Sequence, residues 1–500
     1  MSLDAYNIHI NGAFHCTVRY KQLHSFHEQV GSQMFMLNLC RNTVTPCCCA
    51  QLKKEYGQTS LPTFPPKKLL SLTPAQTEER RSQLEKYIQL VSQDVHIATG
   101  EIFNGFFLRA QQESLNVQEQ PTEVDLYLLN WQRVRVSLLN TAPTSAVLKL
   151  VAQNLNLPAQ YHGYFDIFLV RKYDASHITG LIVGVAVVRW LQDFESPCLT
   201  LQAAGPSKYC LVLRKSYWDM GYDTEVSRDP AGLHLLYVQA VAEVEWGWLR
   251  AGPDSRQQLD SLQARGAKKE YLQLARSLQF YGYLHFPPCI CDFPHPDTPA
   301  IVAVGGRELH LRVKTKAGPS EYSFRVTRIR CWRITTSIAD KPPSDGGGTV
   351  FNSSGDCLRL ELSFEYLMAK DKLQWINLVS DQAILMSVCL QGMVDELLLD
   401  KSGPPSRAPP AVLGPRRASW SYMRRDGTSH QISRSVSTDT FVNGNSRLVV
   451  KEDSPRVSHQ TDKTLAEKLS SLSVKSLRNG HPPKSTMENY AFEGIGDDDL

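Results

Sequence analysis

The order of periodicities between residues 121 and 400 constrains the fold of this chain more than any other feature. "TEVDLYLLN" and "QRVRVSLLN" alternate apolar and polar residues with period two across a short turn, which indicates a β-hairpin. The next segment, "TSAVLKLVAQNLNL", has its apolar residues at helical spacing. A hairpin followed by a crossing helix predicts a ubiquitin-like lobe.

The rest of this region first becomes helical and then returns to strands. Residues 216–286 carry no strand period, whereas "ELHLRVKT", "YSFRVTRIRCWRIT", "CLRLELSFEYLM" and "KLQWINLVS" are typical of strands. They close on one long helix, "DQAILMSVCLQGMVDELLLDK". Strands that end in a single helix predict a barrel of the pleckstrin-homology or phosphotyrosine-binding (PTB) type, so we expect an α+β multidomain protein.

Composition limits the remaining possibilities. The 500 residues carry a net charge of only +4 and 42% apolar residues, values typical of a globular protein and too weakly basic to indicate nucleic acid. The longest apolar run, "GLIVGVAVV", is far shorter than a membrane span, and Met1 does not open a signal peptide. The twelve cysteines lack paired metal-ligand spacing, which favours a reducing, cytosolic compartment.

The segment before residue 116 contains three basic pairs around a proline-rich loop. Arg19-Tyr20 follows two strand-like stretches, Lys67-Lys68 ends "LPTFPPKK", and Arg80-Arg81 lies in an amphipathic helix. Each pair alone could be a solvated surface, but their order around this loop resembles a phox-homology (PX) domain. That resemblance implies binding of phosphatidylinositol 3-phosphate, with Arg19 on the 3-phosphate, Tyr20 on the inositol ring, Lys67 on the 1-phosphate and Arg80 on the ring hydroxyls.

This segment also departs from the PX pattern. The usual first strand is not found, and "VGSQMFMLNLCRNTVTPCCCAQ" (30–51) interrupts what otherwise reads as one helix. We interpret residues 30–51 as translated intron; the alternative is a genuine surface loop. An uninterrupted exon across these codons would exclude the intron.

The closing helix is apolar around more of its circumference than one barrel requires. The excess could pack on a neighbouring lobe or form one wall of a peptide groove. In "RIRCWRIT", inward Ile329 and Cys331 would turn Arg330 and Trp332 outward. An outward Trp332 is typical of a recognition surface, although packing between lobes is the alternative.

The lobe order resembles a FERM domain, and PX followed by FERM resembles a small group of endosomal sorting nexins. That resemblance implies a non-catalytic adaptor without cofactors, on the cytosolic face of early endosomes, that recognises Asn-Pro-x-Tyr or Asn-x-x-Phe motifs in receptor tails. Trp332, Val394 and Leu398 would line the groove. The implied cargo comprises lipoprotein receptors, integrins and the amyloid precursor protein type, returned to the plasma membrane instead of being degraded in lysosomes.

The C-terminal hundred residues divide into a tether and an ending. From about 402 to 485 the chain is rich in Ser, Pro, Arg and Gly, too polar to fold alone, and it ends in "ENYAFEGIGDDDL". In the resembled group this ending engages the Retriever complex, part of Commander; Ile495 and Leu500 would be anchors, and Asp497, Asp498 and Asp499 would meet a basic pocket. A solvated acidic tail is the alternative. "NYAF" has cargo-motif spacing, so Asn489 and Phe492 could occupy the protein's own groove.

These observations predict six regions. They are a PX domain (1–116), FERM lobes F1 (121–215), F2 (216–288) and F3 (289–400), a disordered tether (401–487) and a C-terminal motif (488–500).

The two alternatives to an adaptor are an enzyme and a membrane–cytoskeleton linker. The chain lacks the nucleophile-elbow, P-loop, zincin and phospholipase motifs of an enzyme. A membrane–cytoskeleton linker is the other alternative, since FERM lobes also serve there, but such linkers usually end in an actin-binding segment.

Overall fold

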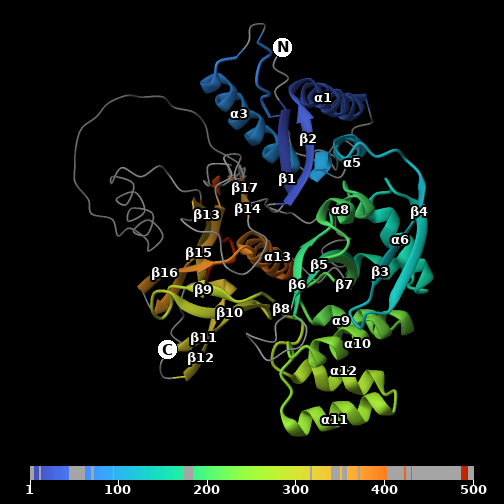
Figure 1. Ribbon diagram of the computed structural model, residues 1–500, viewed down its shortest axis with the longest axis vertical. Coiled ribbons are helices and arrows are strands. Elements are labelled where there is room, and N and C mark those ends of the chain that lie inside the picture. Colours follow the sequence, from blue (N-terminus) through green and yellow to red (C-terminus); the bar gives the residue numbers. More distant parts are fainter. Residues whose placement is uncertain are drawn as a thin grey trace, which may run out of the picture.

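A computed structural model describes most of the folded part of the chain. The described residues are 5–10, 13–43, 62–68, 72–93, 95–98, 100–173, 184–315, 318–338, 350–351, 357–369, 372–401, 422–423, 429–430 and 486–493. They form a PX domain followed by the three lobes of a FERM domain, so the predicted fold class is confirmed (Figure 1).

The PX domain packs a two-stranded antiparallel sheet against helices. Buried rings from α1, α3 and α5 fill its core, among them Phe26, Tyr87, Phe103 and Phe107. Its elements are β1 (Ala5–Ile10), β2 (Ala13–Arg19), α1 (Tyr20–Thr43), α3 (Pro74–Gln93), α4 (Val95–Ala98) and α5 (Glu101–Ser114).

Helix α1 continues through the start of the predicted insertion. It does not end at Val30, and the Val30 side chain is fully buried in the PX core. The helix therefore uses the first residue of the 30–51 segment as a core residue. Residues 44–51 lie outside the described part, so the intron interpretation stays a prediction.

The F1 lobe is a five-stranded sheet in the order β4-β3-β7-β5-β6. The predicted hairpin is β3 paired antiparallel with β4, and the predicted crossing helix is α6. The F1 elements are β3 (Pro121–Tyr127), β4 (Arg133–Leu139), α6 (Thr144–Asn154), η1 (Ala159–Tyr164), β5 (Phe165–Tyr173), β6 (Gly184–Trp190), α8 (Pro197–Ala204) and β7 (Tyr209–Lys215).

The F2 lobe is helical and shares one core with F1. Its central helix α10 begins where Asp229 accepts hydrogen bonds from the N–H groups of Ala231 and Gly232, with Pro230 as its first residue. The F2 helices are α9 (Gly221–Val226), α10 (Pro230–Glu245), α11 (Pro253–Ala264) and α12 (Lys268–Ser277).

The F3 lobe is built on a ten-stranded sheet closed by α13 (Ala383–Lys401). Strand β8 lies inside the range predicted for F2 but pairs with β10 of this sheet. The strands are β8 (Leu284–His285), β9 (Cys289–Cys291), β10 (Thr298–Gly305), β11 (Glu308–Thr315), β12 (Gly318–Arg325), β13 (Ile329–Ile338), β14 (Val350–Phe351), β15 (Cys357–Ala369), β16 (Lys372–Val379) and β19 (Met487–Glu488), with the short helix η2 (Val326–Arg328).

The tether contributes one described hairpin. Strand β17 (Tyr422–Met423) pairs with β18 (Ser429–His430), and the rest of residues 402–485 lies outside the described part. Strand β19 comes from the C-terminal segment, although it belongs to the F3 sheet. Met487, at the end of the predicted tether, and Glu488, at the start of the predicted ending, therefore take part in a folded lobe.

The PX domain is joined to F1 through a small aromatic core. The Phe194 ring from F1 lies 5.8 Å from His15, 5.5 Å from Phe103 and 5.5 Å from Phe107 of the PX domain. Next to it Gln111 donates to Thr200 and accepts from the Ser196 N–H. Apolar and polar contacts therefore both fix the PX domain on F1.

Candidate lipid and peptide sites

A guanidinium–aromatic stack forms the centre of the candidate lipid site. Tyr20 begins α1, and the Cζ atom of Arg80 from α3 lies 4.6 Å from the centre of its ring. The Tyr20 hydroxyl donates to the Pro65 carbonyl over 2.8 Å, which attaches the proline-rich loop to α1. Burial raises the pKa of Tyr20, while Arg80 opposes the rise. Two helices and the loop thus meet at one point.

Arg80 has unused hydrogen-bonding capacity at this point. Its Nη2 atom is buried and has no hydrogen-bond partner within the described residues. The neighbouring Arg81 is instead occupied, because it pairs with Glu78 and with Glu85. Of the two adjacent arginines, Arg80 is the one whose orphaned donor calls for an anion or a hydroxyl.

The other two predicted lipid residues lie close to this stack along the chain. Arg19 is exposed at the end of β2, directly before Tyr20. Lys67 is exposed two residues after Pro65, whose carbonyl accepts from Tyr20. Arg80 and Tyr20 are therefore in contact, whereas Arg19 and Lys67 are near them only along the chain, next to Tyr20 and Pro65.

Phe64 holds the proline-rich loop in place, although the basic pairs and prolines of the sequence did not single it out. The Phe64 ring lies 4.9 Å from His27 and 4.9 Å from Tyr87, and it also contacts Tyr20 at 5.6 Å. An aromatic residue between prolines in an otherwise polar loop was the available signal. Phe64 anchors the loop that carries Lys67.

The peptide site is occupied by the chain's own C-terminal segment. Strand β19 adds antiparallel to β13, with Met487 opposite Trp332 and Glu488 opposite Cys331. The backbone N–H of Asn489 then donates to the Arg330 carbonyl over 3.0 Å. This is strand addition at the edge of the F3 sheet.

Asn489 uses both ends of its side-chain amide. Its Nδ2 atom donates to the carbonyls of Val326 (2.7 Å) and Ile329 (2.6 Å), and its Oδ1 atom accepts from the N–H of Ala491 (2.9 Å). The side chain is 6% exposed. An aspartate here would face two carbonyl oxygens without donors, so the site selects asparagine.

The four residues from Asn489 to Phe492 form a turn. The N–H of Phe492 donates to the Asn489 carbonyl, and the N–H of Glu493 donates to the Thr327 carbonyl. Ala491 is fully buried, Phe492 is half-buried, and Tyr490 is 58% exposed. Within the turn, Asn489 and Ala491 are therefore enclosed, and Tyr490, the second position of the motif, faces solvent.

Trp332 does not face outward, and this prediction was wrong. It is fully buried, its Nε1–H donates to the Ser387 hydroxyl over 3.0 Å, and it packs in the F3 core with Phe364. The cause is a β-bulge: the β13–β15 register shifts between Ile329 and Cys331, so Arg330 is the extra residue. The bulge reverses the alternation and turns Trp332 into the core.

Helix α13 provides the other wall of the groove. Val394 is buried, Leu398 is half-buried, and both pack in the cluster that contains Trp332, Ala491 and Met487. The three predicted groove residues thus belong to one apolar cluster with the docked segment. The role predicted for them in cargo binding remains an expectation.

The opposite face of α13 packs on the connection between F1 and F2. Glu396 accepts from the N–H groups of Trp218 and Asp219, and Gly392 lies against the Trp218 indole. One of the two alternatives, packing on a neighbouring lobe, therefore applies to this face, and the peptide groove on the other face stays a prediction.

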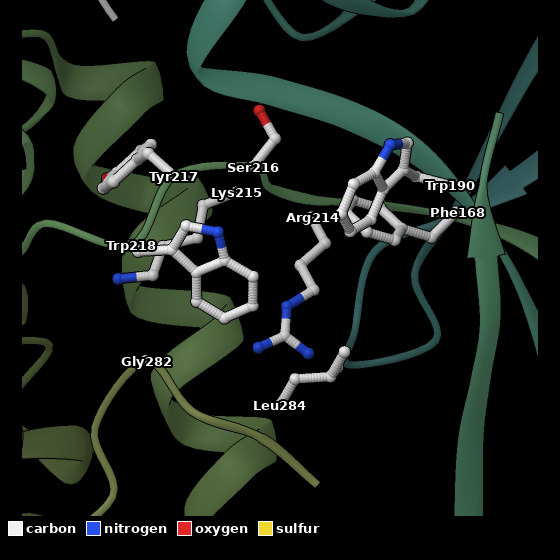
Figure 2. Close-up of a pocket in the computed structure, with 9 residues that line it drawn as sticks. All are labelled: Phe168, Trp190, Arg214, Lys215, Ser216, Tyr217, Trp218, Gly282 and Leu284. Atoms are coloured by element: carbon white, nitrogen blue, oxygen red, sulfur yellow. The ribbon is translucent and has the colours of Figure 1, made fainter. Parts of the chain in front are cut away.

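The junction of the three lobes contains a small cavity. Figure 2 shows Arg214 between Trp218 and Leu284, with Trp190 and Phe168 on the other side. Its volume of about 20 Å³ accommodates about one water molecule. Arg214 also pairs with Glu243 and donates to the Tyr283 carbonyl. This size and pairing indicate a structural junction.

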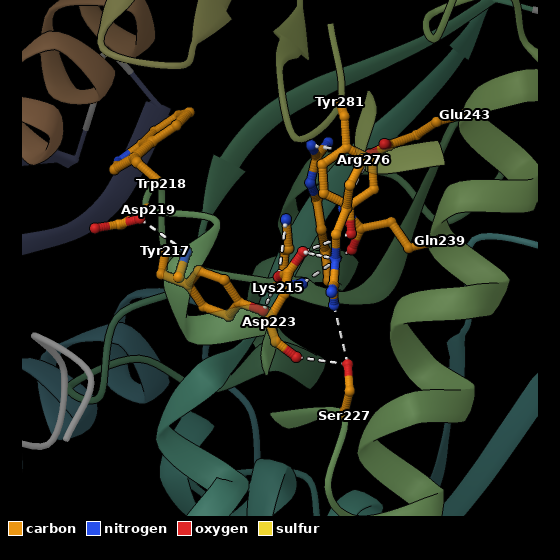
Figure 3. Close-up of polar contacts among 12 residues, drawn as sticks. Lys215, Tyr217, Trp218, Asp219, Asp223, Ser227, Gln239, Glu243, Arg276 and Tyr281 are labelled. Carbon is orange, nitrogen blue, oxygen red and sulfur yellow. Dashed lines mark hydrogen bonds and ion pairs between the residues drawn. The ribbon is translucent and has the colours of Figure 1, made fainter. Parts of the chain in front are cut away.

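A buried carboxylate, Asp223, bonds to Lys215 and Tyr217, which line the cavity, and organises the junction (Figure 3). Asp223 accepts from Tyr217 (2.5 Å), Tyr281 (2.6 Å), Lys215 (3.2 Å) and Arg276 (3.3 Å). Burial alone would raise the pKa of Asp223, but these donors and cations outweigh it and the pKa lies below its ordinary value. The network is saturated, so it acts as scaffold.

The remaining predicted residues lie beyond the described part. Ile495, Asp497, Asp498, Asp499 and Leu500 follow Glu493, the last described residue. Within the described ranges no cluster of His, Cys, Asp and Glu could hold a metal ion. None of the described helices combines the length and apolar character needed to cross a bilayer.

Family models match four consecutive parts of the chain. They are the PX domain (residues 50–110), the F1 lobe of the sorting nexin 17/27/31 FERM domain (122–218), the F2 lobe of the sorting nexin 17/31 FERM domain (219–279) and the Sorting Nexin 17 FERM C-terminal domain (282–398). The PX match begins at residue 50, within the last two residues of the predicted insertion, and leaves Arg19 and Tyr20 outside it.

Curated relatives match over most of their length. Sorting nexin-17 of Danio rerio is 41% identical over 100% of this chain and 96% of the relative. Sorting nexin-17 of Homo sapiens is 41% identical over 99% and 96%. Sorting nexin-31 of Homo sapiens is 30% identical over 79% and 81%. The chain therefore belongs to the PX–FERM sorting nexins, a family of non-enzymatic adaptors in endosomal sorting, as a homologue of sorting nexin-17.

Proposed function

We propose that this chain is an endosomal cargo adaptor. Its PX domain binds phosphatidylinositol 3-phosphate, its groove between β13 and α13 binds Asn-Pro-x-Tyr or Asn-x-x-Phe motifs in receptor tails, and its C-terminal ending recruits Retriever and Commander. The cargo is returned to the plasma membrane instead of being degraded in lysosomes. The main support is the docked segment 486–493, an Asn-x-x-Phe sequence already seated beside β13.

The lipid part of the proposal is supported by unused cationic groups. Among the residues that the structure describes, Arg80 has a buried Nη2 donor without a hydrogen-bond partner, while Arg19 and Lys67 are exposed nearby along the chain. A phosphoinositide headgroup supplies phosphate oxygens for the lysine and the arginine, and ring hydroxyls for the orphaned donor. Tyr20 already carries Arg80 on its ring, so it holds this guanidinium in place.

The cargo part rests on the bonds that the docked segment makes. Strand pairing to β13 and the Asn489 amide bonds need only a backbone and an asparagine, which every Asn-Pro-x-Tyr motif provides. The exposed position of Tyr490 corresponds to the proline, and half-buried Phe492 corresponds to the tyrosine. The groove is apolar, so we expect an unphosphorylated tyrosine to bind better than a phosphotyrosine.

The docked segment and receptor tails then compete for one groove. A tethered ligand acts at an effective concentration of roughly millimolar, so a receptor tail must displace 486–493. Displacement frees the chain that follows Glu493, which carries Ile495, Asp497–Asp499 and Leu500. We propose that cargo binding makes this ending accessible to Retriever.

Liposomes that carry both ligands test the proposal. Full-length protein is pelleted with vesicles containing phosphatidylinositol 3-phosphate, a lipid-anchored Asn-Pro-x-Tyr peptide, or both. We expect the two ligands together to retain far more protein than either alone, because two weak contacts become one attachment. Retention that does not depend on the peptide motif would contradict the cargo role.

A membrane–cytoskeleton linker is the alternative function. Peptide 488–500, immobilised and exposed to purified Retriever or to filamentous actin, separates the two. The adaptor proposal expects Retriever to bind and actin not to bind. Binding of actin alone would favour the linker.

A further inference from the structure

Helix α13 makes contacts on two opposite faces, one toward the groove and one toward the connection between F1 and F2. Val394 and Leu398 follow Ser387 by seven and eleven residues, close to whole numbers of helical turns, so these three residues share the face toward the groove. Gly392 and Glu396 lie about half a turn away from that face. They point to the connection between F1 and F2, where Trp218 and Asp219 lie.

Glu396 makes the polar half of this second contact. It is 8% exposed, and its carboxylate accepts from the Trp218 N–H (3.1 Å) and the Asp219 N–H (2.9 Å). Trp218 and Asp219 are 178 and 177 residues away in sequence. Hydrogen bonds from backbone N–H groups to an ionised carboxylate are stronger than neutral ones. This contact therefore fixes the helix relative to another lobe.

Gly392 makes the apolar half, one turn before Glu396. A Cβ atom at this position would lie 2.7 Å from the Trp218 Nε1 atom, closer than side chains tolerate. The indole can rest on the helix only because the residue is glycine. The same indole forms a wall of the junction cavity in Figure 2, so a side chain at position 392 would displace it and change the packing at this junction.

Asp219 is itself held from a third direction. Its carboxylate pairs with Arg307 in the turn between β10 and β11 (3.4 Å) and accepts from the Gly221 N–H (2.8 Å). The connection between F1 and F2 is thereby tied to F3 at two places, the helix and the turn. Glu396 therefore binds to a segment that also contacts F3 through Arg307.

We infer that Glu396 and Gly392 are positioning residues for the peptide groove. The groove is the space between α13 and β13. Its width therefore depends on the contacts that α13 makes on its opposite face, which carries Gly392 and Glu396. The F1–F2 connection makes these contacts with the two residues, which lie on the face of α13 turned toward Trp218 and Asp219. This inference rests on the proposed function, because it assigns residues that set the affinity of the same groove.

Thermodynamic reciprocity makes the inference testable from both sides. If the contact with the F1–F2 connection favours the binding-competent position of α13, then a bound peptide must in turn favour that contact. Peptide binding should therefore slow hydrogen exchange of the Trp218 and Asp219 amides, although neither residue lies in the groove. A contact that only contributed to folding would not respond to peptide.

The experiment uses the full chain with Asn489→Ala, which removes the anchor of the docked segment, so that the groove is available to added peptide. Calorimetry with an Asn-Pro-x-Tyr peptide compares this parent with added Glu396→Ala and with added Asp395→Ala. Asp395 is the matched control, since it is the adjacent carboxylate and pairs with Gln391 instead. We expect about tenfold weaker binding for Glu396→Ala, which leaves two N–H donors without a partner, and unchanged binding for Asp395→Ala.

Hydrogen exchange supplies the second measurement. Peptide should slow exchange at residues 218–219 in the parent and in Asp395→Ala, but not in Glu396→Ala. Protection of the β13 and β15 amides of F3 in the same exchange experiment checks that each variant is folded. If Glu396→Ala does not fold, Glu396→Gln replaces it: one amide oxygen still accepts, and we expect about threefold weaker binding.

The possible failures are distinguishable. A folded Glu396 variant that binds the peptide as tightly as the parent, or a parent whose 218–219 amides ignore the peptide, would overturn the inference and leave the proposed function intact. A parent that binds no peptide would overturn the proposed function itself.

Discussion

Trp332 of β13 and Met487 of the C-terminal segment lie directly opposite each other where β19 pairs with β13. Ser387 connects them on the side of α13, since its hydroxyl accepts from the Trp332 indole and lies 3.8 Å from the Met487 sulfur. Trp332 thus lies in the core beneath residues 486–493, which cover it. Its substitution affects folding and binding together.

Trp332→Ala is therefore expected to destabilise F3 by about 3–5 kcal/mol, as for other buried aromatic truncations. Native-state hydrogen exchange of β13 measures this loss. Trp375→Ala is the control: Trp375 is half-buried on the other face under Arg333 (4.2 Å), and we expect a loss of about 0.5–1 kcal/mol. Equal losses for the two tryptophans would contradict the buried position of Trp332.

Asn489→Ala should release the docked segment. The change removes both bonds to the Val326 and Ile329 carbonyls, a loss of about 2 kcal/mol in docking free energy. Hydrogen exchange at residues 486–493 should then become fast. The adjacent Tyr490→Ala, at a position 58% exposed, should leave exchange unchanged; fast exchange in both variants would mean that Asn489 is not the anchor.

Arg80→Ala should weaken binding of phosphatidylinositol 3-phosphate by at least about tenfold, because it removes the orphaned guanidinium donor and the group stacked on Tyr20. Arg81→Ala removes the same charge from the next residue, which is paired with Glu78 and Glu85. Vesicle flotation should show a clearly smaller effect for Arg81→Ala. Similar losses would indicate general attraction to anionic lipid instead of a defined site.

His15 should make the PX–F1 contact sensitive to acid. Burial, together with Arg189 and against Glu195, lowers the pKa of His15 from 6.5 to about 4. The unfolded chain therefore binds a proton that the folded chain does not, so stability is complete above pH 6.5 and falls as the pH drops toward 4. We expect a loss of about 2 kcal/mol between pH 7.5 and pH 5.

His15→Phe is the test of that pH dependence. The phenyl ring suits a site lined by Phe107 and Phe194 and has no proton to gain. Denaturant unfolding of PX–F1 should show a shallower fall with acid in this variant than in the parent. Identical pH profiles would show that His15 is not responsible.

Local periodicity predicted most of the fold. The alternation in "TEVDLYLLN" and "QRVRVSLLN" corresponds to the β3–β4 hairpin, and helical spacing around Val151 corresponds to α6. Both patterns reflect one buried face, which period-two and period-3.6 analysis detects. The same analysis failed at Trp332, because the extra residue Arg330 in a β-bulge leaves no mark in an apolar pattern.

The sequence predicted which residues belong to the candidate sites better than it predicted how those residues contact one another. The sequence indicated that Tyr20 and Arg80 belong to one site, but not that the guanidinium lies on the ring. It indicated the spacing of "NYAF", but not that Asn489 would bond to two carbonyls. The contact of α13 with the F1–F2 connection could not be predicted from the sequence, because Gly392 matters only through the Trp218 indole, 174 residues earlier in the chain.

The central claim is that the space between β13 and α13 accepts short Asn-x-x-Phe or Asn-Pro-x-Tyr segments. Titration calorimetry of full-length Asn489→Ala protein with an Asn-Pro-x-Tyr receptor peptide tests it most directly, with an Asn-to-Ala peptide and a Leu398→Asp protein as controls. We predict that the native peptide binds, that the Asn-to-Ala peptide binds at least about tenfold more weakly, and that Leu398→Asp abolishes binding. Equal affinity for both peptides, or unchanged binding to the Leu398→Asp protein, would contradict the claim.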